Sequence, residues 1–228
     1  MNALASTPVI QIPESAIGFG KIIEGTYPEV LSDIYQKDTN IVIWQRDIPS
    51  SLRQAAADIL LMHPDLQLSI IAAPEEFCAA INKELGPTQA VEILSQDIAV
   101  LVEMFCCLFD LKRAGLRLTV LDRAICPRFH VDKVPCRLVT TYQGVATEWL
   151  PHVAADRSKL GAGNLGKSDE QSGLFKNTTD IRRLGQGDVA LLKGERWVGN
   201  EGAGLIHRSP SLSNETRRLL LTLDFIDD

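Results

Sequence analysis

Residues 126–132 read CPRFHVD, and we predict that this segment is a strand. On a strand, side chains two residues apart point to the same face, so His130 and Asp132 would lie together there. A third side chain for a metal site must come from elsewhere in the chain. The candidate is His207, in the stretch GLIHRSP at residues 204–210. The sequence therefore predicts a metal site made of two imidazoles and one carboxylate.

The hydrophobic pattern around this segment changes at Gly115, from a helical to a strand-like period. Before this glycine, apolar spacing and capping residues predict one strand and then three helices, at 40–46, 51–63, 74–86 and 88–115. After it, alternation predicts further strands at 116–121, 136–142, 189–192 and 217–225. Helices followed by many short strands indicate an α+β fold in which N-terminal helices pack on a double-stranded β-helix, a cupin-like jelly roll.

We expect a single domain over residues 1–228, in which 1–115 is a mainly helical buttress and 116–228 is the jelly-roll core. A long, polar, glycine-rich loop is expected near 152–180. Long loops in compact domains are commonly functional or mobile. This loop is therefore expected to be a lid near the metal site.

Charge and composition exclude some classes of partner and location. The net charge of −6 and the lack of a long basic tract argue against a nucleic-acid binder or a protein that binds anionic membranes. A local basic pocket is still compatible with this overall charge. No stretch approaches the roughly 20 apolar residues of a membrane span, and residues 1–6 do not resemble a signal peptide. Five cysteines without zinc-finger spacing fit free thiols in a reducing compartment. We therefore expect a cytoplasmic location.

The order of these features resembles the 2-oxoglutarate-dependent Fe(II) dioxygenases over residues 116–225. His130 and Asp132 come first, then a Gly-Asp turn at 187–188 with an apolar strand, then His207, and then an arginine pair. The resemblance implies Fe(II) held by the facial triad of His130, Asp132 and His207, with three positions left open for 2-oxoglutarate and O2. It implies an oxygenase that acts on a small molecule or a peptide.

The resemblance also requires a cation for the distal carboxylate of 2-oxoglutarate, and arginine binds a carboxylate through two parallel hydrogen bonds. Arg217 and Arg218 would point to opposite faces of their strand. We prefer Arg218, which shares its face with Thr222. Tyr142 and Thr140, on one face of the 136–142 strand, are further candidates for contact with the cosubstrate.

Several segments also resemble an uncharacterised bacterial domain family that is associated with gene clusters of the zinc-starvation response. They are CPRFHVD at 126–132, TYQG at 141–144, TEWLP at 147–151 and DVALLKGE at 188–195. This resemblance implies an alternative function, a non-catalytic protein of metal binding or metal homeostasis on the same fold, in which the metal could be zinc.

Two further alternatives follow from the residues themselves. GAGNLGKS at 161–168 matches the P-loop pattern of nucleotide-binding proteins, but the neighbouring sequence predicts neither the strand before it nor the helix after it. Cys126 and Cys136 flank the site and could form a Cys/His zinc site, although their spacing fits no usual zinc pattern. His63 and His152 are expected to be structural histidines.

Overall fold

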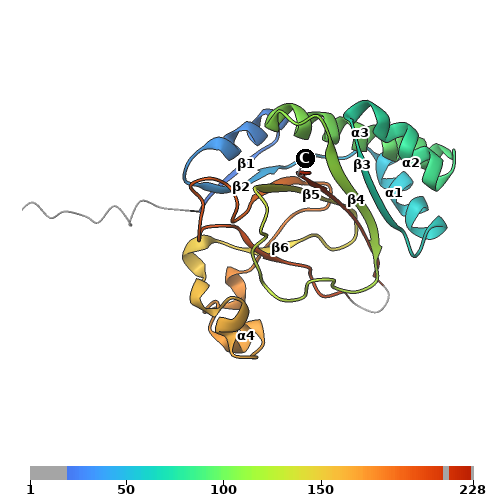
Figure 1. The fold of residues 1–228 in the computed structure, drawn as a ribbon. Coiled ribbons are helices and arrows are strands. Elements are labelled where there is room, and N and C mark those ends of the chain that lie inside the picture. The colour runs from blue at the N-terminus through green and yellow to red at the C-terminus, as the bar shows by residue number, and fades with distance from the viewer. Residues whose placement is uncertain (1–19, 213–215, 227–228) are drawn as a thin grey trace, which may run out of the picture.

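The computed structural model describes residues 20–212 and 216–226, and within them the strands form two sheets (Figure 1). The larger sheet has seven strands in the order β1-β2-β8-β5-β10-β4-β3, in which only the β1–β2 pair is parallel. Their bounds are β1 Lys21–Gly25, β2 Thr39–Trp44, β3 Gln67–Ala72, β4 Ala114–Leu121, β5 Cys136–Gln143, β8 Val189–Lys193 and β10 Arg218–Asp224. The smaller sheet, β7-β6-β9, consists of β7 Arg182–Arg183, β6 Glu148–Leu150 and β9 Ile206–Arg208.

Three α-helices cover one face of the larger sheet (Figure 1). They are α1 Ser50–Met62, α2 Phe77–Leu85 and α3 Gln89–Phe109, with short 3-10 helices η2 Pro28–Tyr35 and η3 Pro74–Glu76 beside them. The apolar stripe that predicted the longest helix is buried, and Thr88 caps its start by accepting a hydrogen bond from the backbone N–H of Val91. The helix ends earlier than predicted, at Phe109, and the residue that follows it, Asp110, has a φ of 53°. Gly115 lies in β4 instead.

The N-terminal part of the chain is more than a helical buttress, because β1, β2 and β3 all belong to the larger sheet. Only β2 was expected there. β3 lies at an edge of the sheet, and three of its six residues are exposed. Such a strand lacks the continuous apolar run that makes a central strand easy to recognise.

The two faces of the larger sheet differ in character, as β10 illustrates. Leu219, Leu221 and Leu223 pack in the core that the helices cover. Arg218 and Thr222 alternate with them and line a pocket on the opposite face, which the smaller sheet approaches. The functional residues described below lie on this second face.

The segment 152–180 is built from short turns of helix rather than an unstructured loop. These are η4 His152–Ala154, η5 Arg157–Lys159, η6 Gly161–Asn164, α4 Asp169–Ser172 and η7 Thr178–Asp180. Leu174 and Phe175 fix the segment in a small apolar cluster with Phe129, Leu150 and Ile206. In Figure 1 it lies on the side of the molecule away from the helices.

None of the described helices is long and apolar enough to cross a bilayer. Residues 1–6, on which the expected location partly rests, lie outside the described residues.

Candidate metal centre

The segment 126–132 is not the strand that its sequence predicts. Between β4 and β5 only His130 makes a sheet-like pair, an isolated antiparallel bridge to His207. The neighbouring backbone N–H of Phe129 donates instead to a carboxylate oxygen of Asp169, at 2.9 Å. The carboxylate of Asp169 thus accepts the hydrogen bond that a backbone carbonyl of a partner strand would otherwise accept.

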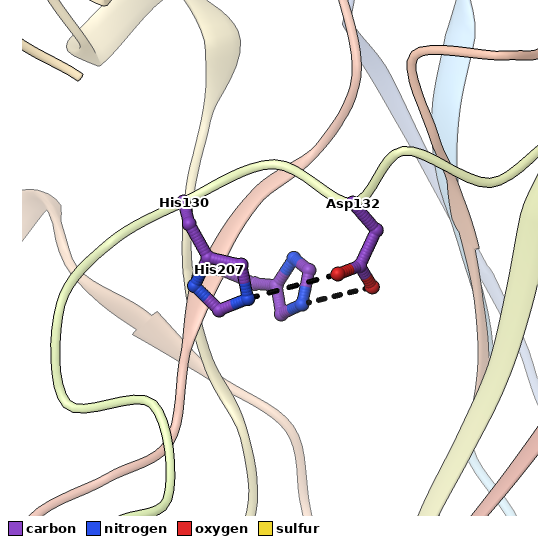
Figure 2. A group of neighbouring side chains, drawn as sticks. All are labelled: His130, Asp132 and His207. Atoms are coloured by element: carbon purple, nitrogen blue, oxygen red, sulfur yellow. Dashed lines mark ion pairs between the residues drawn. The ribbon is translucent and has the colours of Figure 1, made fainter. Parts of the chain in front are cut away.

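His130, Asp132 and His207 nevertheless come together (Figure 2). Nε2 of His130 lies 3.7 Å from Oδ1 of Asp132, and Nε2 of His207 lies 3.4 Å from Oδ2. One potential ligand atom from each residue lies within 4.8 Å of the other two. Two ligands that each lie about 2.1 Å from one ion are separated by at most about 4.2 Å, and each of the two nitrogen–oxygen distances meets this limit, although they end on different oxygens of Asp132.

The backbone fixes which nitrogen each imidazole presents. Nδ1 of His130 donates to the carbonyl of Arg128 at 2.9 Å, and Nδ1 of His207 donates to the carbonyl of Leu205 at 3.2 Å. Because a carbonyl can only accept, the proton of each neutral ring lies on Nδ1 and the lone pair lies on Nε2. Burial and the neighbouring His207 lower the pKa of His130, which favours this neutral form.

Arg137, which the sequence did not single out, holds the carboxylate of the group. Its Nη1 donates to Oδ2 of Asp132 at 2.5 Å, while its Nε donates to Oδ1 of Asp224 at 2.7 Å. Burial alone would raise the pKa of Asp132. The nearby His207, when its ring is protonated, and the charge of Arg137 lower it well below its usual value. Asp132 is therefore ionised, as a metal ligand must be.

A pocket of about 250 Å³ opens beside the two histidines, on the face of the larger sheet away from the helices. The residues that line it include four arginines and no carboxylate: Arg117, Thr119, Ile125, Cys126, His130, Arg137, Val139, Thr147, Leu192, His207, Arg208, Ser209, Arg218, Leu220 and Thr222. Arg117, Arg137 and Arg208 form ion pairs with carboxylates, which offset part of this positive charge.

Arg218 is the most deeply buried of these arginines, with 1% of its surface exposed. Its Nη2 donates to the hydroxyls of Thr141 at 3.0 Å and Thr147 at 2.6 Å. Within the described residues it forms no ion pair with a carboxylate, and burial lowers its pKa to about 10. A buried cation that is held only by neutral hydroxyls is poised to bind an anion.

The other candidates for cosubstrate contact take two different positions. Thr222 lines the pocket with Arg218, whereas Arg217 is exposed and donates to the carbonyl of Pro64 at 3.4 Å, outside the pocket. Tyr142 lies in the core on the helix side, where its hydroxyl donates to Asp97 at 2.6 Å. Thr140 shares the face of Tyr142 by strand alternation and does not line the pocket. The expectation that Tyr142 and Thr140 face the cosubstrate is therefore wrong.

The cysteine and histidine alternatives for a metal site do not form one. Cys126 lines the pocket, but Cys136 is buried in the core on the other face of the sheet, where burial raises the pKa of its thiol. Across the described parts of the chain, His130, Asp132 and His207 form the one group with metal-binding geometry, and neither His63 nor His152 joins it.

The glycine-rich stretch at 161–168 lacks the structure of a P-loop. A 3-10 helix, η5, precedes it, and the α-helix that follows, α4, has four residues. Phosphate binding requires a strand before the glycines and a helix whose N-terminal amides point at the phosphates. The nucleotide-binding alternative is therefore not supported.

Comparisons with known proteins give a family and a shared fold. The family described as "Protein of unknown function (DUF1826)" matches residues 25–224. No curated protein matches the chain. Among solved structures, the dioxygenase for auxin oxidation of rice matches with a TM-score of 0.50 and 12% identity, over 89% of this chain and 81% of that one.

Two further solved structures match less closely in shape. A prolyl-4-hydroxylase of Pseudomonas putida has a TM-score of 0.47 and 12% identity, over 86% of this chain and 96% of that one. The dioxygenase for auxin oxidation 1 of Arabidopsis thaliana, solved with 2-oxoglutarate, has a TM-score of 0.40 and 10% identity, over 86% and 75%. At these identities the comparison with the rice enzyme shows a shared fold, and the chemistry must be argued from the site itself.

Proposed function

We propose that this chain, which belongs to the DUF1826 family, is an Fe(II)- and 2-oxoglutarate-dependent oxygenase on a double-stranded β-helix. The observation that carries the proposal is the position of Arg218. This buried cation has no carboxylate partner within the described residues, and it lines the same pocket as His130 and His207. 2-Oxoglutarate has one end that chelates a metal and a distal carboxylate that requires a cation.

His130, Asp132 and His207 would hold Fe(II) through Nε2, a carboxylate oxygen and Nε2 respectively. In the neutral form of each ring Nε2 carries the lone pair, and Asp132 is ionised, so the donor set fits a divalent ion. When bound, Fe(II) supplies the redox chemistry with O2 that is coupled to decarboxylation of 2-oxoglutarate. Two histidines and one carboxylate leave open positions for both reactants.

The protein's own part is to bind and orient the cosubstrate. Arg218 pairs with its distal carboxylate, and the hydroxyl of Thr222 lies in the same pocket to donate a further hydrogen bond. Val139, Leu192 and Leu220 form apolar walls that limit the access of water. Arg137 keeps the carboxylate of Asp132 in place through its bond at 2.5 Å.

Turnover without the primary substrate tests this proposal. With Fe(II), ascorbate and O2, the protein should convert 2-oxoglutarate into succinate and CO2, measured by NMR of succinate. One oxygen atom of O2 enters succinate and the other leaves as water, and ascorbate supplies the two electrons that a primary substrate would otherwise provide. The primary substrate is a small molecule or a peptide whose reacting group reaches the pocket.

Substitution of the metal ligands gives the matched measurement. His130→Ala, Asp132→Ala and His207→Ala should each lower the amount of bound metal and leave circular dichroism nearly unchanged. Metal-free wild-type protein combined with unfolded variants would show that the three residues are structural. Wild-type protein that is purified without added metal, holds zinc tightly and never consumes 2-oxoglutarate would instead support the metal-homeostasis alternative.

A further inference from the structure

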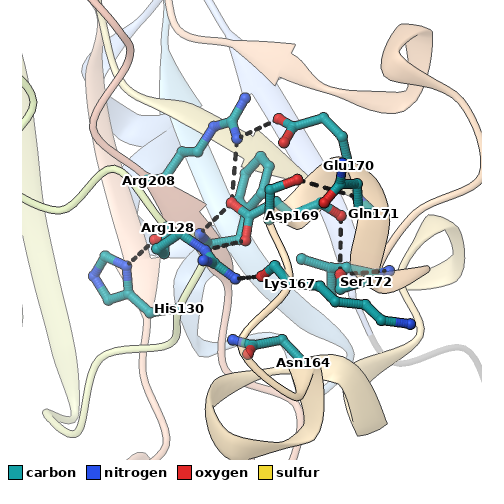
Figure 3. A network of polar contacts seen from close by, with 12 residues as sticks. Arg128, His130, Asn164, Lys167, Asp169, Glu170, Gln171, Ser172 and Arg208 are labelled. Carbon is teal, nitrogen blue, oxygen red and sulfur yellow. Dashed lines mark hydrogen bonds and ion pairs between the residues drawn. The ribbon is translucent and has the colours of Figure 1, made fainter.

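Asp169 of α4 is a buried carboxylate that contacts both histidine-bearing segments (Figure 3). Its Oδ1 accepts a hydrogen bond from Nε of Arg128 at 2.9 Å. Its Oδ2 accepts one from the backbone N–H of Phe129 at 2.9 Å and one from Nη1 of Arg208 at 3.2 Å. Asp169 is 4% exposed, so its carboxylate is shielded from water, although the side chain of Arg128 is partly exposed.

The contacts reach the immediate neighbours of both histidine ligands. Phe129 directly precedes His130, and Arg208 directly follows His207. Arg128 also supplies the carbonyl that orients the His130 ring at 2.9 Å. The backbones of the two segments are joined by the His130–His207 bridge and by one hydrogen bond from the N–H of Ser209 to the carbonyl of Cys126, at 2.9 Å. A carboxylate that bonds to both of them therefore helps to set the separation and the orientation of the two rings.

The rest of the network keeps Asp169 in place. Nη2 of Arg128 donates to the carbonyl of Lys167, two residues before Asp169. Arg208 stacks over the ring of Phe129 at 4.3 Å and donates to Glu148 at 2.8 Å. Glu170, next in the chain, also accepts from Arg208 at 3.3 Å, but its side chain is 51% exposed. Glu170 thus offers a control that shares the helix and a partner of Asp169 without its burial.

We infer that Asp169 is a positioning residue of the metal centre, through which the segment 152–180 and the metal stabilise each other. The inference rests on the proposed metal site but not on 2-oxoglutarate chemistry. Seating of α4 holds Arg128, Phe129 and Arg208, and these residues hold the two histidines. Since coupling between two sites is reciprocal, metal binding also holds the 152–180 segment in place.

The test compares Asp169→Asn with Glu170→Gln, and its probe is Co(II) alone. Co(II) affinity is measured by competition with a chelator, and its visible absorption spectrum reports the ligand geometry. Asp169→Asn should weaken Co(II) binding by about 10- to 100-fold, the usual effect of losing a partner outside the ligand shell, and should change the spectrum. Glu170→Gln should stay within about threefold of wild type, because its contact is exposed.

Limited proteolysis measures the coupling itself. Co(II) should slow cleavage within residues 152–180 of the wild type and of Glu170→Gln. It should no longer do so in Asp169→Asn, even at Co(II) concentrations that saturate the variant. A residue that only stabilises the fold would raise the cleavage rate with and without metal by the same factor.

The outcomes separate this inference from the proposed function. If the wild type does not bind Co(II), the metal site and this inference both fail. If the wild type binds Co(II) but Asp169→Asn has the same affinity, spectrum and protection, only the role of Asp169 is wrong. Should Asp169→Asn fail to fold, Arg128→Gln decides instead, since it removes the partly exposed donor to Oδ1 and keeps the backbone carbonyl that orients His130. Unchanged Co(II) affinity and protection in Arg128→Gln would overturn the inference.

Discussion

Replacing Arg218 with alanine tests whether the pocket beside the metal centre binds a dicarboxylate. Arg218 is 1% exposed, contacts the hydroxyls of Thr141 and Thr147, and has its pKa lowered to about 10 by burial. A cation in this state has already lost its hydration and has gained no countercharge within the described residues. It should therefore bind a carboxylate strongly.

The expected magnitude follows from the loss of one charge-assisted contact, about 1.5–3 kcal/mol, which is roughly a 10- to 100-fold loss of affinity. At a 2-oxoglutarate concentration of about 100 times the wild-type Kd, binding stabilises the wild type by about 2.7 kcal/mol. A chain of this size gains about 2–4 °C in Tm per kcal/mol, so the shift should be about 5–11 °C. The variant should gain only about 0.4–1.4 kcal/mol at the same concentration, or about 1–6 °C.

The assay is thermal unfolding with saturating metal, with and without 2-oxoglutarate, on samples of measured metal content. Arg217→Ala is the matched control, because Arg217 precedes Arg218 in the chain but is exposed and donates to Pro64 on the other side of the sheet. It should keep the full wild-type shift. Equal shifts in Arg218→Ala and the wild type, at equal metal content, would refute the reasoning, and a loss confined to Arg217→Ala would exchange the two roles.

Three further predictions follow from the positions of other residues. A nonspecific protease should cut first within 161–167, where most residues are exposed. Bound metal together with 2-oxoglutarate should slow that cleavage. Protection by a nucleotide instead would restore the P-loop interpretation. Tyr142→Phe should lower the free energy of unfolding by about 1–3 kcal/mol in urea, because Asp97 loses a donor at 2.6 Å, and weaker 2-oxoglutarate binding would contradict its placement away from the pocket. Gly144→Ala should lower both the stability and the 2-oxoglutarate affinity in the same assays. Gly144 has a φ of 89°, and an added Cβ would lie 2.3 Å from the carbonyl oxygen of Arg217, the residue before β10. Unchanged affinity would show that β10 absorbs the strain without moving the pocket.

The faces of two strands show what alternation in the sequence can decide. In β10 the run Leu219, Leu221 and Leu223 marks the core face, so the opposite direction of Arg218 could be predicted. In β5 both faces are largely buried and both contain threonines, so polarity does not distinguish them. Tyr142 was placed on the wrong face for this reason. A strand that is buried on both sides carries little information about which face holds the site.

The three proposed metal ligands were predicted partly from a local strand that the structure does not contain. The strand expected at 126–132 does not form, yet His130 and Asp132 still converge with His207, because their order in the chain reflects the fold rather than a local strand. What positions them is contributed from far along the chain: Asp169 lies about 40 residues from each of its partners, and Asp224 lies 87 residues from Arg137.

A charged residue in a glycine-rich segment gives no sequence signal for such distant contacts. The match of residues 161–168 to the P-loop pattern even drew attention to a different chemistry. The segment's clearest link to the metal centre is instead a carboxylate one residue beyond that pattern. Only its burial and its three partners distinguish Asp169 from the exposed Glu170 beside it. The comparison of Asp169→Asn with Glu170→Gln therefore measures what the fold adds to two adjacent acidic residues that the sequence alone does not separate.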